Sequence, residues 1–125
     1  MIKSRFEIEL KRGESVEMLF TLALYGIAKR RGISLNLPAE AGADERITYF
    51  IKRMYCAAIL AWEYEAIDNP KLGEFPYKFM DFAEWSGNNP VQFASIIKKA
   101  SSALAGEDFG EEDKDPNTED VKKKI

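Results

Sequence analysis

Three acidic residues have the type and spacing for acid–base or metal chemistry. Glu63 and Glu65 flank Tyr64, and Asp68 follows three residues after Glu65. Because residues three apart share a helix face, Glu65 and Asp68 could form an acid pair or part of a cation site. The same spacing is typical of a solvated helix end, and no calcium-binding Asp-x-Asp-Gly loop accompanies it. We therefore favour a solvated helix end.

Two residue types limit other catalytic chemistry. The chain has no histidine, which excludes Ser-His-Asp and Cys-His triads, histidine-bound zinc and imidazole catalysis. The single cysteine, Cys56, excludes an intrachain disulfide, and its apolar surroundings predict an inert buried thiol rather than a nucleophile. No glycine-rich phosphate loop is present. The sequence thus predicts a protein that is not an enzyme and uses no cofactor or metal.

A basic cluster is the feature that could bind nucleic acid. It consists of Lys29, Arg30, Arg31, Lys52 and Arg53. The formal net charge of the chain is −3, and the aromatics and glycines of an RNA-recognition strand are missing. Residues 29–31 would equally stabilise the negative end of a helix. We do not expect nucleic acid as a partner, although a nucleic-acid-binding accessory protein stays an alternative.

Large apolar side chains supply the candidate partner-binding surface. The candidates are Phe50, Met54, Trp62, Phe79, Phe82 and Trp85. Aromatic residues at helical spacing, Phe93 among them, more often form a core than a pocket. A small chain with this much apolar surface can also keep one apolar face for partners. The sequence leaves both interpretations open: core alone, or a core shared with an interface.

The first element expected is a β-hairpin. Apolar and charged residues alternate over 2–10, the period of a strand with one buried face. A turn at 11–14 containing Gly13 and a second alternation over 16–20 complete the hairpin. A helix starting at Ser15 is the alternative. We expect Thr21 to cap a helix over 22–31 that ends at Gly32.

Further helices are expected after a connection over 33–43. Asp44 should cap a helix over about 45–67, in which 16 of the 21 residues from Ile47 to Ile67 are hydrophobic. A helix that is apolar nearly all round must be covered on several sides. The remaining elements are a helix over 76–85 opened by Pro76, and a helix over 90–104 capped by Asn89. The inward residues expected in that last helix are Val91, Phe93, Ala94, Ile97 and Leu104.

The fold class that follows is α+β, predominantly α, with a short N-terminal hairpin and about four helices. We expect one globular domain over 1–105 and a flexible, disordered segment over 106–125, which has 8 acidic and 4 basic side chains. No apolar stretch reaches the roughly 18 residues of a membrane span, and the N-terminus does not look like a signal peptide. The expected location is cytoplasmic.

This order of elements resembles the tail assembly chaperones of long-tailed bacteriophages and prophages. The resemblance lies in the hairpin FEIEL-KRGE-VEMLF, the helix TLALYGIAKRRG, the middle segment WEYEAIDNPKLGEFPYKFMDFAEW and the closing helix NNPVQFASIIKKASSAL. It covers about residues 5–105 and is one of pattern rather than of a diagnostic motif. The long connection over Pro38–Gly42 and the aromatic middle helix depart from the family pattern.

The resemblance implies a non-enzymatic role. Such proteins bind the long helical tape-measure protein during tail morphogenesis, many copies to one client. We expect self-association through the hairpin, which has a free strand edge, and through the apolar middle helix. It also implies a longer form made by ribosomal slippage, for which the codons of Lys122–Lys124 are candidates. A small helical adaptor or regulator from a mobile element is the main alternative.

Overall fold

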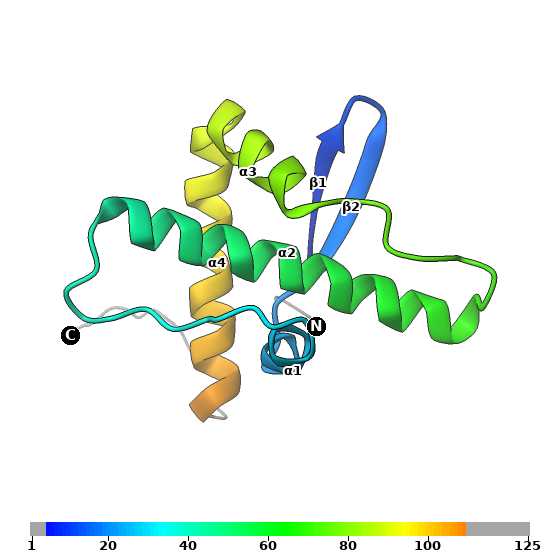
Figure 1. Cartoon of the computed structure of the whole chain (residues 1–125), viewed down its shortest axis with the longest axis horizontal. Helices are drawn as coiled ribbons and strands as arrows, with labels where there is room; N and C mark the ends of the chain where they lie inside the picture. Colours follow the sequence, from blue (N-terminus) through cyan, green and yellow to red (C-terminus); the bar gives the residue numbers. More distant parts are fainter. Residues whose placement is uncertain (1–4, 110–125) are drawn as a thin grey trace.

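The computed structural model describes residues 5–109 and, within them, the side chains as far as residue 101. A two-stranded antiparallel hairpin is followed by four helices, so most of the described chain is helical (Figure 1). This confirms the predicted fold class. The predicted segment over 106–125 lies mostly outside the described residues, as does the start of the first predicted strand.

The hairpin consists of β1 (Arg5–Lys11) and β2 (Glu14–Leu19). Phe6 pairs with Met18 and Ile8 pairs with Val16, which places the apolar residues of both strands on one face. At the turn, Gly13 has φ +76°, and its N–H donates to the Glu9 carboxylate at 2.8 Å. The period-two pattern therefore predicted a strand correctly, and the alternative helix from Ser15 is wrong.

The first helix, α1 (Leu24–Arg30), begins two residues later than predicted. Thr21 still takes part: its hydroxyl accepts the Ala23 N–H at 3.3 Å, and its carbonyl accepts the Leu24 N–H at 3.0 Å. That second bond spans three residues, so a tighter turn precedes the α-helix. The predicted end is confirmed, because Gly32 has φ +72° and the following N–H, of Ile33, donates to Ala28 at 2.8 Å.

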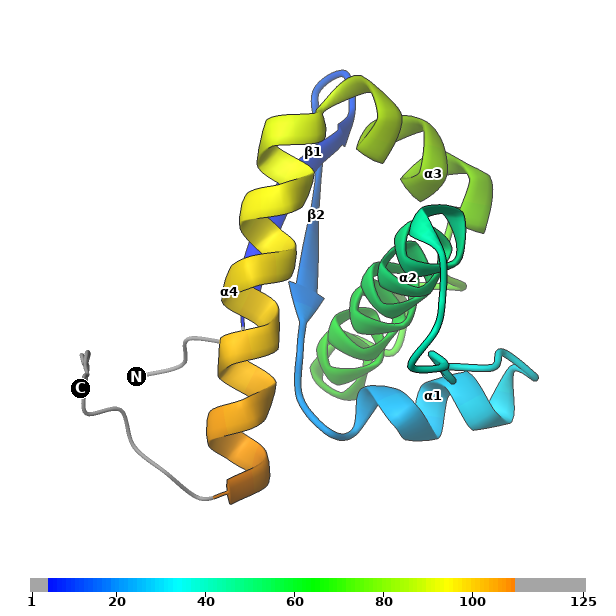
Figure 2. The same cartoon turned by 90° about the vertical axis from the view of Figure 1, so that its left-hand side faces the viewer.

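The central element is α2 (Ala43–Asp68), a helix of 26 residues. Its N-cap is Gly42 rather than the predicted Asp44, because the Glu45 carboxylate accepts the Gly42 N–H at 3.0 Å and leaves Asp44 in the first turn. The helix packs against β2, α1 and α3, and its residues 56–61 are all buried. In Figures 1 and 2, α3 lies above it and α1 below it. The prediction that it is covered on several sides is confirmed.

The last two helices are α3 (Phe79–Asn88) and α4 (Pro90–Phe109). The prediction that Pro76 opens α3 is wrong, because Lys78 is the capping residue and Asp81 accepts its N–H at 2.8 Å. Pro90 opens α4 as predicted, and Asn89 lies at the predicted cap position, but its side chain does not cap α4. Its side chain donates to the Trp85 carbonyl at 2.8 Å at the end of α3, while its backbone carbonyl accepts the Phe93 N–H.

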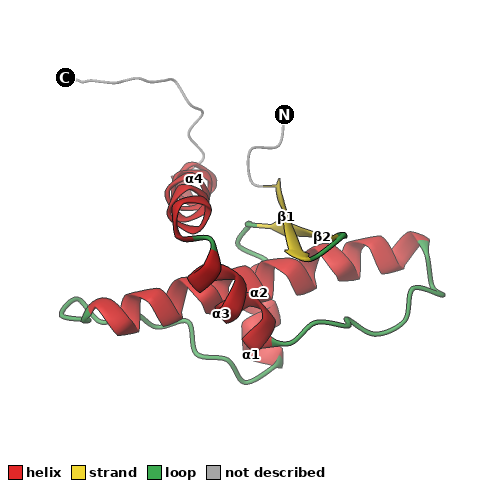
Figure 3. Cartoon of the chain, turned by 90° about the horizontal axis from the view of Figure 1, so that it is seen from above, coloured by secondary structure: helices red, strands yellow, loops and turns green. Residues whose placement is uncertain are grey.

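The buried stripe of α4 differs from the predicted one. Ile96 and Ala100 are buried, whereas Val91 is 82% exposed and Ala94 is also exposed. Together with the half-buried Phe93 and Ile97, the buried pair follows the i, i+3, i+4, i+7 spacing of a single helix face, which excludes positions 91 and 94. Figure 3 shows α4 on the same side of α2 as the hairpin. Its backbone continues five residues past the predicted end at 104, and the Leu104 side chain lies outside the described ones.

Candidate functional site

The six predicted partner-binding residues divide into two groups. Met54, Phe82 and Trp85 are 1%, 0% and 6% exposed, and they belong to the core between the hairpin, α2 and α3. Phe50, Trp62 and Phe79 are half-buried and reach the surface. In this conformation a partner can therefore contact only the second group, so the interface hypothesis is narrowed to those three residues.

An aromatic cluster connects α2 with the segment over 69–78. Tyr55 meets the rings of Phe75 and Phe79 at 6.1 and 5.9 Å, in edge-on arrangements. Phe75 also lies 5.7 Å from both Trp62 and Tyr77. Tyr55, Phe75 and Tyr77 were not among the site residues predicted from the sequence. The spacing of Phe75 and Tyr77 around Pro76 was the signal, because an extended segment places alternate side chains on one face.

A second contact fixes the same segment. The indole Nε1–H of Trp62 donates to the carbonyl oxygen of Gly73 at 3.0 Å. Figures 1 and 3 show the segment running back along the C-terminal half of α2 toward the start of α3. Residues 69–78 therefore form a strap that is held to the helix, and Trp62 is the residue that anchors it.

A groove of about 360 Å³ lies between the hairpin and the C-terminal half of α2. Its lining residues are Glu7, Ser15, Val16, Glu17, Ala58, Ala61, Trp62, Glu65 and Tyr77. Val16, Ala58 and Ala61 are buried beneath it, and Trp62 and Tyr77 contribute half-buried rings. The groove therefore combines an apolar floor with the carboxylates of three glutamates.

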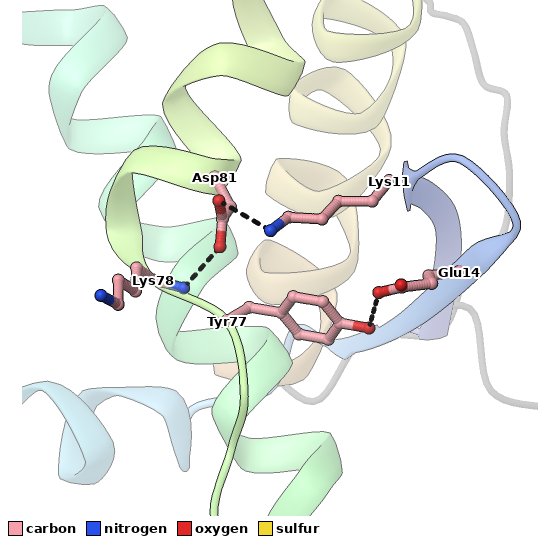
Figure 4. Close-up of polar contacts among 5 residues, drawn as sticks. All are labelled: Lys11, Glu14, Tyr77, Lys78 and Asp81. Carbon is pink, nitrogen blue, oxygen red and sulfur yellow. Dashed lines mark hydrogen bonds and ion pairs between the residues drawn. The ribbon is translucent and has the colours of Figure 1, made fainter.

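Polar contacts fix the hairpin turn against the start of α3 (Figure 4). The Tyr77 hydroxyl donates to Glu14 at 2.9 Å, and the Lys11 ammonium lies 3.4 Å from the Asp81 carboxylate. The Lys78 N–H and then Lys11 hold the pKa of Asp81 below its usual value. Burial and the hydrogen bond to Glu14 raise the pKa of Tyr77. These contacts position Tyr77 at the groove.

Replacing Asp81 with asparagine should lower stability by about 1 kcal/mol at pH 7, roughly 4 °C in melting temperature, because α3 loses its carboxylate cap and the ion pair. Since the pKa of Asp81 is lowered on folding, its contribution is present above the unfolded pKa and lost as the pH falls through the folded value. Thermal unfolding at pH 7 and pH 3 measures both effects. Glu84→Gln, at an exposed position of α3, is the control. An equal deficit at both pH values would contradict the prediction.

The acidic residues near the end of α2 do not converge on one site. Glu63 forms an ion pair with Arg30, Glu65 lies at the groove, and Asp68 is exposed. Among the side chains that the structure describes, no group of three or more cysteine, aspartate or glutamate residues is placed to hold a metal ion. Glu65 and Asp68 are both exposed, as expected for the solvated helix end that was favoured from the sequence.

Cys56 is fully buried in the core. Burial raises its pKa to about 11, and the nearby Arg31 opposes this shift only in part. The thiol is therefore protonated at neutral pH and lacks the thiolate form that a nucleophile needs.

Ionisation of Cys56 should make stability fall in alkaline solution. The pKa of Cys56 is higher in the folded state than its unfolded value near 9. Its contribution to the free energy of unfolding is therefore constant below about pH 9 and is lost as the pH rises towards 11. We expect a loss of about 1 kcal/mol between pH 8 and pH 10. The measurement is urea unfolding of the wild type and Cys56→Ala at both pH values. The variant should lack this part of the loss, and parallel losses in the two proteins would contradict the assignment.

The five residues of the predicted basic cluster differ in exposure and in their partners. Lys29 and Arg31 are exposed, Arg30 pairs with Glu63, and Lys52 is half-buried. Arg53 is only 5% exposed, so its inclusion in a surface patch is wrong. Its Nε and Nη2 atoms have no hydrogen-bond partner. The sequence missed this burial because α2 is covered on several sides, and an arginine on such a helix is carried inward with its apolar neighbours.

Comparison of the chain with protein families, curated proteins and solved structures gives no match. In the part of the chain that the structure describes, no helix is long and apolar enough to span a membrane. A proposal on function therefore rests on the groove, on the exposed apolar residues and on the resemblance of the sequence pattern.

Proposed function

We propose that the protein is a non-enzymatic tail assembly chaperone that binds a helix of a tape-measure-like protein in the groove between the hairpin and α2. The observation that carries the proposal is the groove itself, with its apolar floor and the rings of Trp62 and Tyr77. An amphipathic helix lays its apolar face into a groove of this kind. The carboxylates of Glu7, Glu17 and Glu65 favour a client helix whose apolar stripe is flanked by lysine or arginine.

A separate surface serves self-association. Tyr64 and Ile67 are 50% and 73% exposed on the C-terminal part of α2. They follow the groove residues Trp62 and Glu65 by two positions, which is about 200° around a helix, so they lie on the opposite face. One copy can therefore hold a client in the groove while it contacts another copy through Tyr64 and Ile67. This supports the proposal that many copies cover one client.

The alternatives receive different support. A small helical adaptor from a mobile element would use the same groove, and the client distinguishes it from a tail chaperone. A nucleic-acid-binding role loses support, because Arg53 is buried and Arg30 is paired with Glu63.

Co-expression with the client tests the proposed function. We expect the gene to lie beside genes for a tail tube and a tape-measure protein. The tape-measure protein should stay in the soluble fraction only when this protein is co-expressed with it. Charge reversal by Glu7→Arg with Glu65→Arg should weaken binding about tenfold. Glu84→Arg, on an exposed position away from the groove, should leave binding unchanged. Absence of binding by the wild type at micromolar concentration would overturn the proposal.

Substitutions of Tyr64 and Ile67 should abolish self-association without loss of fold. We expect dimers or larger species of the wild type at tens of micromolar in sedimentation velocity, and monomers of Tyr64→Ser with Ile67→Asp. The melting temperature should change little, because both side chains are largely exposed. Val91→Asp, at the 82% exposed position of α4, is the matched control. A wild type that stays monomeric would contradict the assembly role.

A further inference from the structure

Arg53 combines burial with an unsatisfied charge. Its side chain is 5% exposed, and its guanidinium carries a positive charge. The ion pairs of the described chain are Arg5–Glu17, Lys11–Asp81 and Arg30–Glu63, so none of them neutralises Arg53. A buried charge without a counter-charge is unfavourable, which means that this group is poised to gain from an anion.

The unpartnered atoms define the shape of that anion. Nε and Nη2 lack hydrogen bonds, and these two atoms lie on the same edge of the planar guanidinium. Their N–H bonds run nearly parallel, in the fork that matches the two oxygens of a carboxylate. The bidentate donor edge formed by Nε and Nη2 therefore has no acceptor.

The surroundings define what accompanies the carboxylate. The guanidinium carbon lies 5.9 Å from the ring centre of Phe20 and 5.6 Å from those of Tyr49 and Phe50. Rings at these distances attract the cation, but they carry no negative charge to neutralise it. Tyr49 and Phe50 are half-buried and form the outer part of this enclosure. These rings favour a ligand with apolar groups next to its charge, and access to Arg53 requires that the side chains of Tyr49 and Phe50 move.

We propose that Arg53 is a carboxylate-binding residue, and that its ligand is a carboxylate flanked by apolar groups. A phosphate fits less well, because the enclosure supplies one cation and three aromatic rings. The neighbouring Lys52 ammonium donates to the carbonyl oxygen of Ser34 at 3.5 Å, so it is not offered to the anion as a second cation. The carboxylate comes either from a small aromatic acid or from an aspartate or glutamate in an apolar stretch of a polypeptide. This site is independent of the proposed client groove.

The test is an NMR titration of the full ¹⁵N-labelled chain, following the Nε–H resonance of Arg53. The first probe is sodium benzoate, with benzamide and sodium phosphate as matched neutral and anionic controls. The second probe is a helical peptide with one glutamate between leucines, compared with its glutamine counterpart. We expect a saturable shift with a carboxylate probe and none with its control. A response to benzoate alone assigns the site to small acids, and a response to the glutamate peptide assigns it to polypeptides.

Variants separate binding from general salt effects. Arg53→Lys keeps the charge but lacks the bidentate donor edge, so it should weaken binding at least tenfold. The affinity is measured from the ring resonances of Tyr49 and Phe50. Arg46→Lys, at an exposed position of the same helix, should bind as the wild type does. The proposal is overturned if neither probe shifts Arg53, if benzamide or phosphate shifts it equally, or if Arg53→Lys binds with unchanged affinity.

Discussion

Phe82→Ala should destabilise the protein by about 4 kcal/mol, because it removes a large, completely enclosed ring. Phe82 is 0% exposed. Its ring lies 5.7 Å from that of Tyr55 and is stacked on Phe75 at 6.4 Å, so the core loses contacts from both α2 and the strap. The neighbouring elements are held by other contacts and cannot close the cavity fully. A loss of this size is a large fraction of the stability of an ordinary domain.

Urea unfolding of the variant measures this loss. Met80→Ala is the matched control, since Met80 is 62% exposed on the same helix and should change stability by less than about 0.5 kcal/mol. A destabilisation by Phe82→Ala below about 1 kcal/mol would show that the ring is not enclosed as described. Loss of partner binding in Phe82→Ala would result from unfolding. Substitutions of Tyr64, Ile67 and the groove glutamates instead test direct contact with another copy or with the client.

The elements that the sequence predicted are those encoded by local chemistry. The hairpin follows from alternation over the first residues and from Gly13, whose positive φ few other residues adopt. The end of α1 follows from Gly32 for the same reason. The burial of α2 follows from an apolar composition that no single covered face accommodates.

Two predictions about side-chain caps were wrong because the chain offers equivalent local partners. Asp44 and Glu45 can both satisfy an exposed backbone N–H, and the hydrogen bond from Gly42 to Glu45 decides where α2 begins. Asn89 can cap the helix before or after it, and its side chain bonds to Trp85. Either choice satisfies the local sequence rules, so tertiary packing decides between them.

The candidate site could be predicted only in part. The sequence indicated that aromatic residues serve both core and surface, but it could not separate Phe82 from Trp62, because both occur at helical spacing. The groove needs the hairpin and α2 side by side, residues that are distant in the chain. Arg53 was misplaced because a lone arginine is ordinarily at the surface. Natural sequences violate such local rules chiefly at functional sites, which is consistent with the ligand site proposed for Arg53.

Arg53→Met should stabilise the protein, by about 2 kcal/mol at pH 7. Methionine fills a similar volume and removes a charge that is 95% buried, together with two N–H groups that lack acceptors. The loss of attraction to Phe20, Tyr49 and Phe50 opposes this gain, and a desolvated cation over a ring gains roughly 2 kcal/mol. We expect the desolvation of the charge, several kcal/mol, together with about 1–3 kcal/mol for each unsatisfied N–H group, to exceed these contacts, so the substitution is favourable overall.

Chemical denaturation and NMR titration of the same variant together test this prediction. The midpoint in urea should rise, while the response of the Tyr49 and Phe50 rings to benzoate should disappear. Arg46→Met, at an exposed position of α2, should change neither quantity, which controls for the hydrophobic substitution itself. A variant that is less stable by more than about 1 kcal/mol would show that the aromatic contacts outweigh the unsatisfied charge. Arg53 would then be a structural cation, whereas a more stable variant without benzoate binding identifies a residue retained for its ligand at the expense of stability.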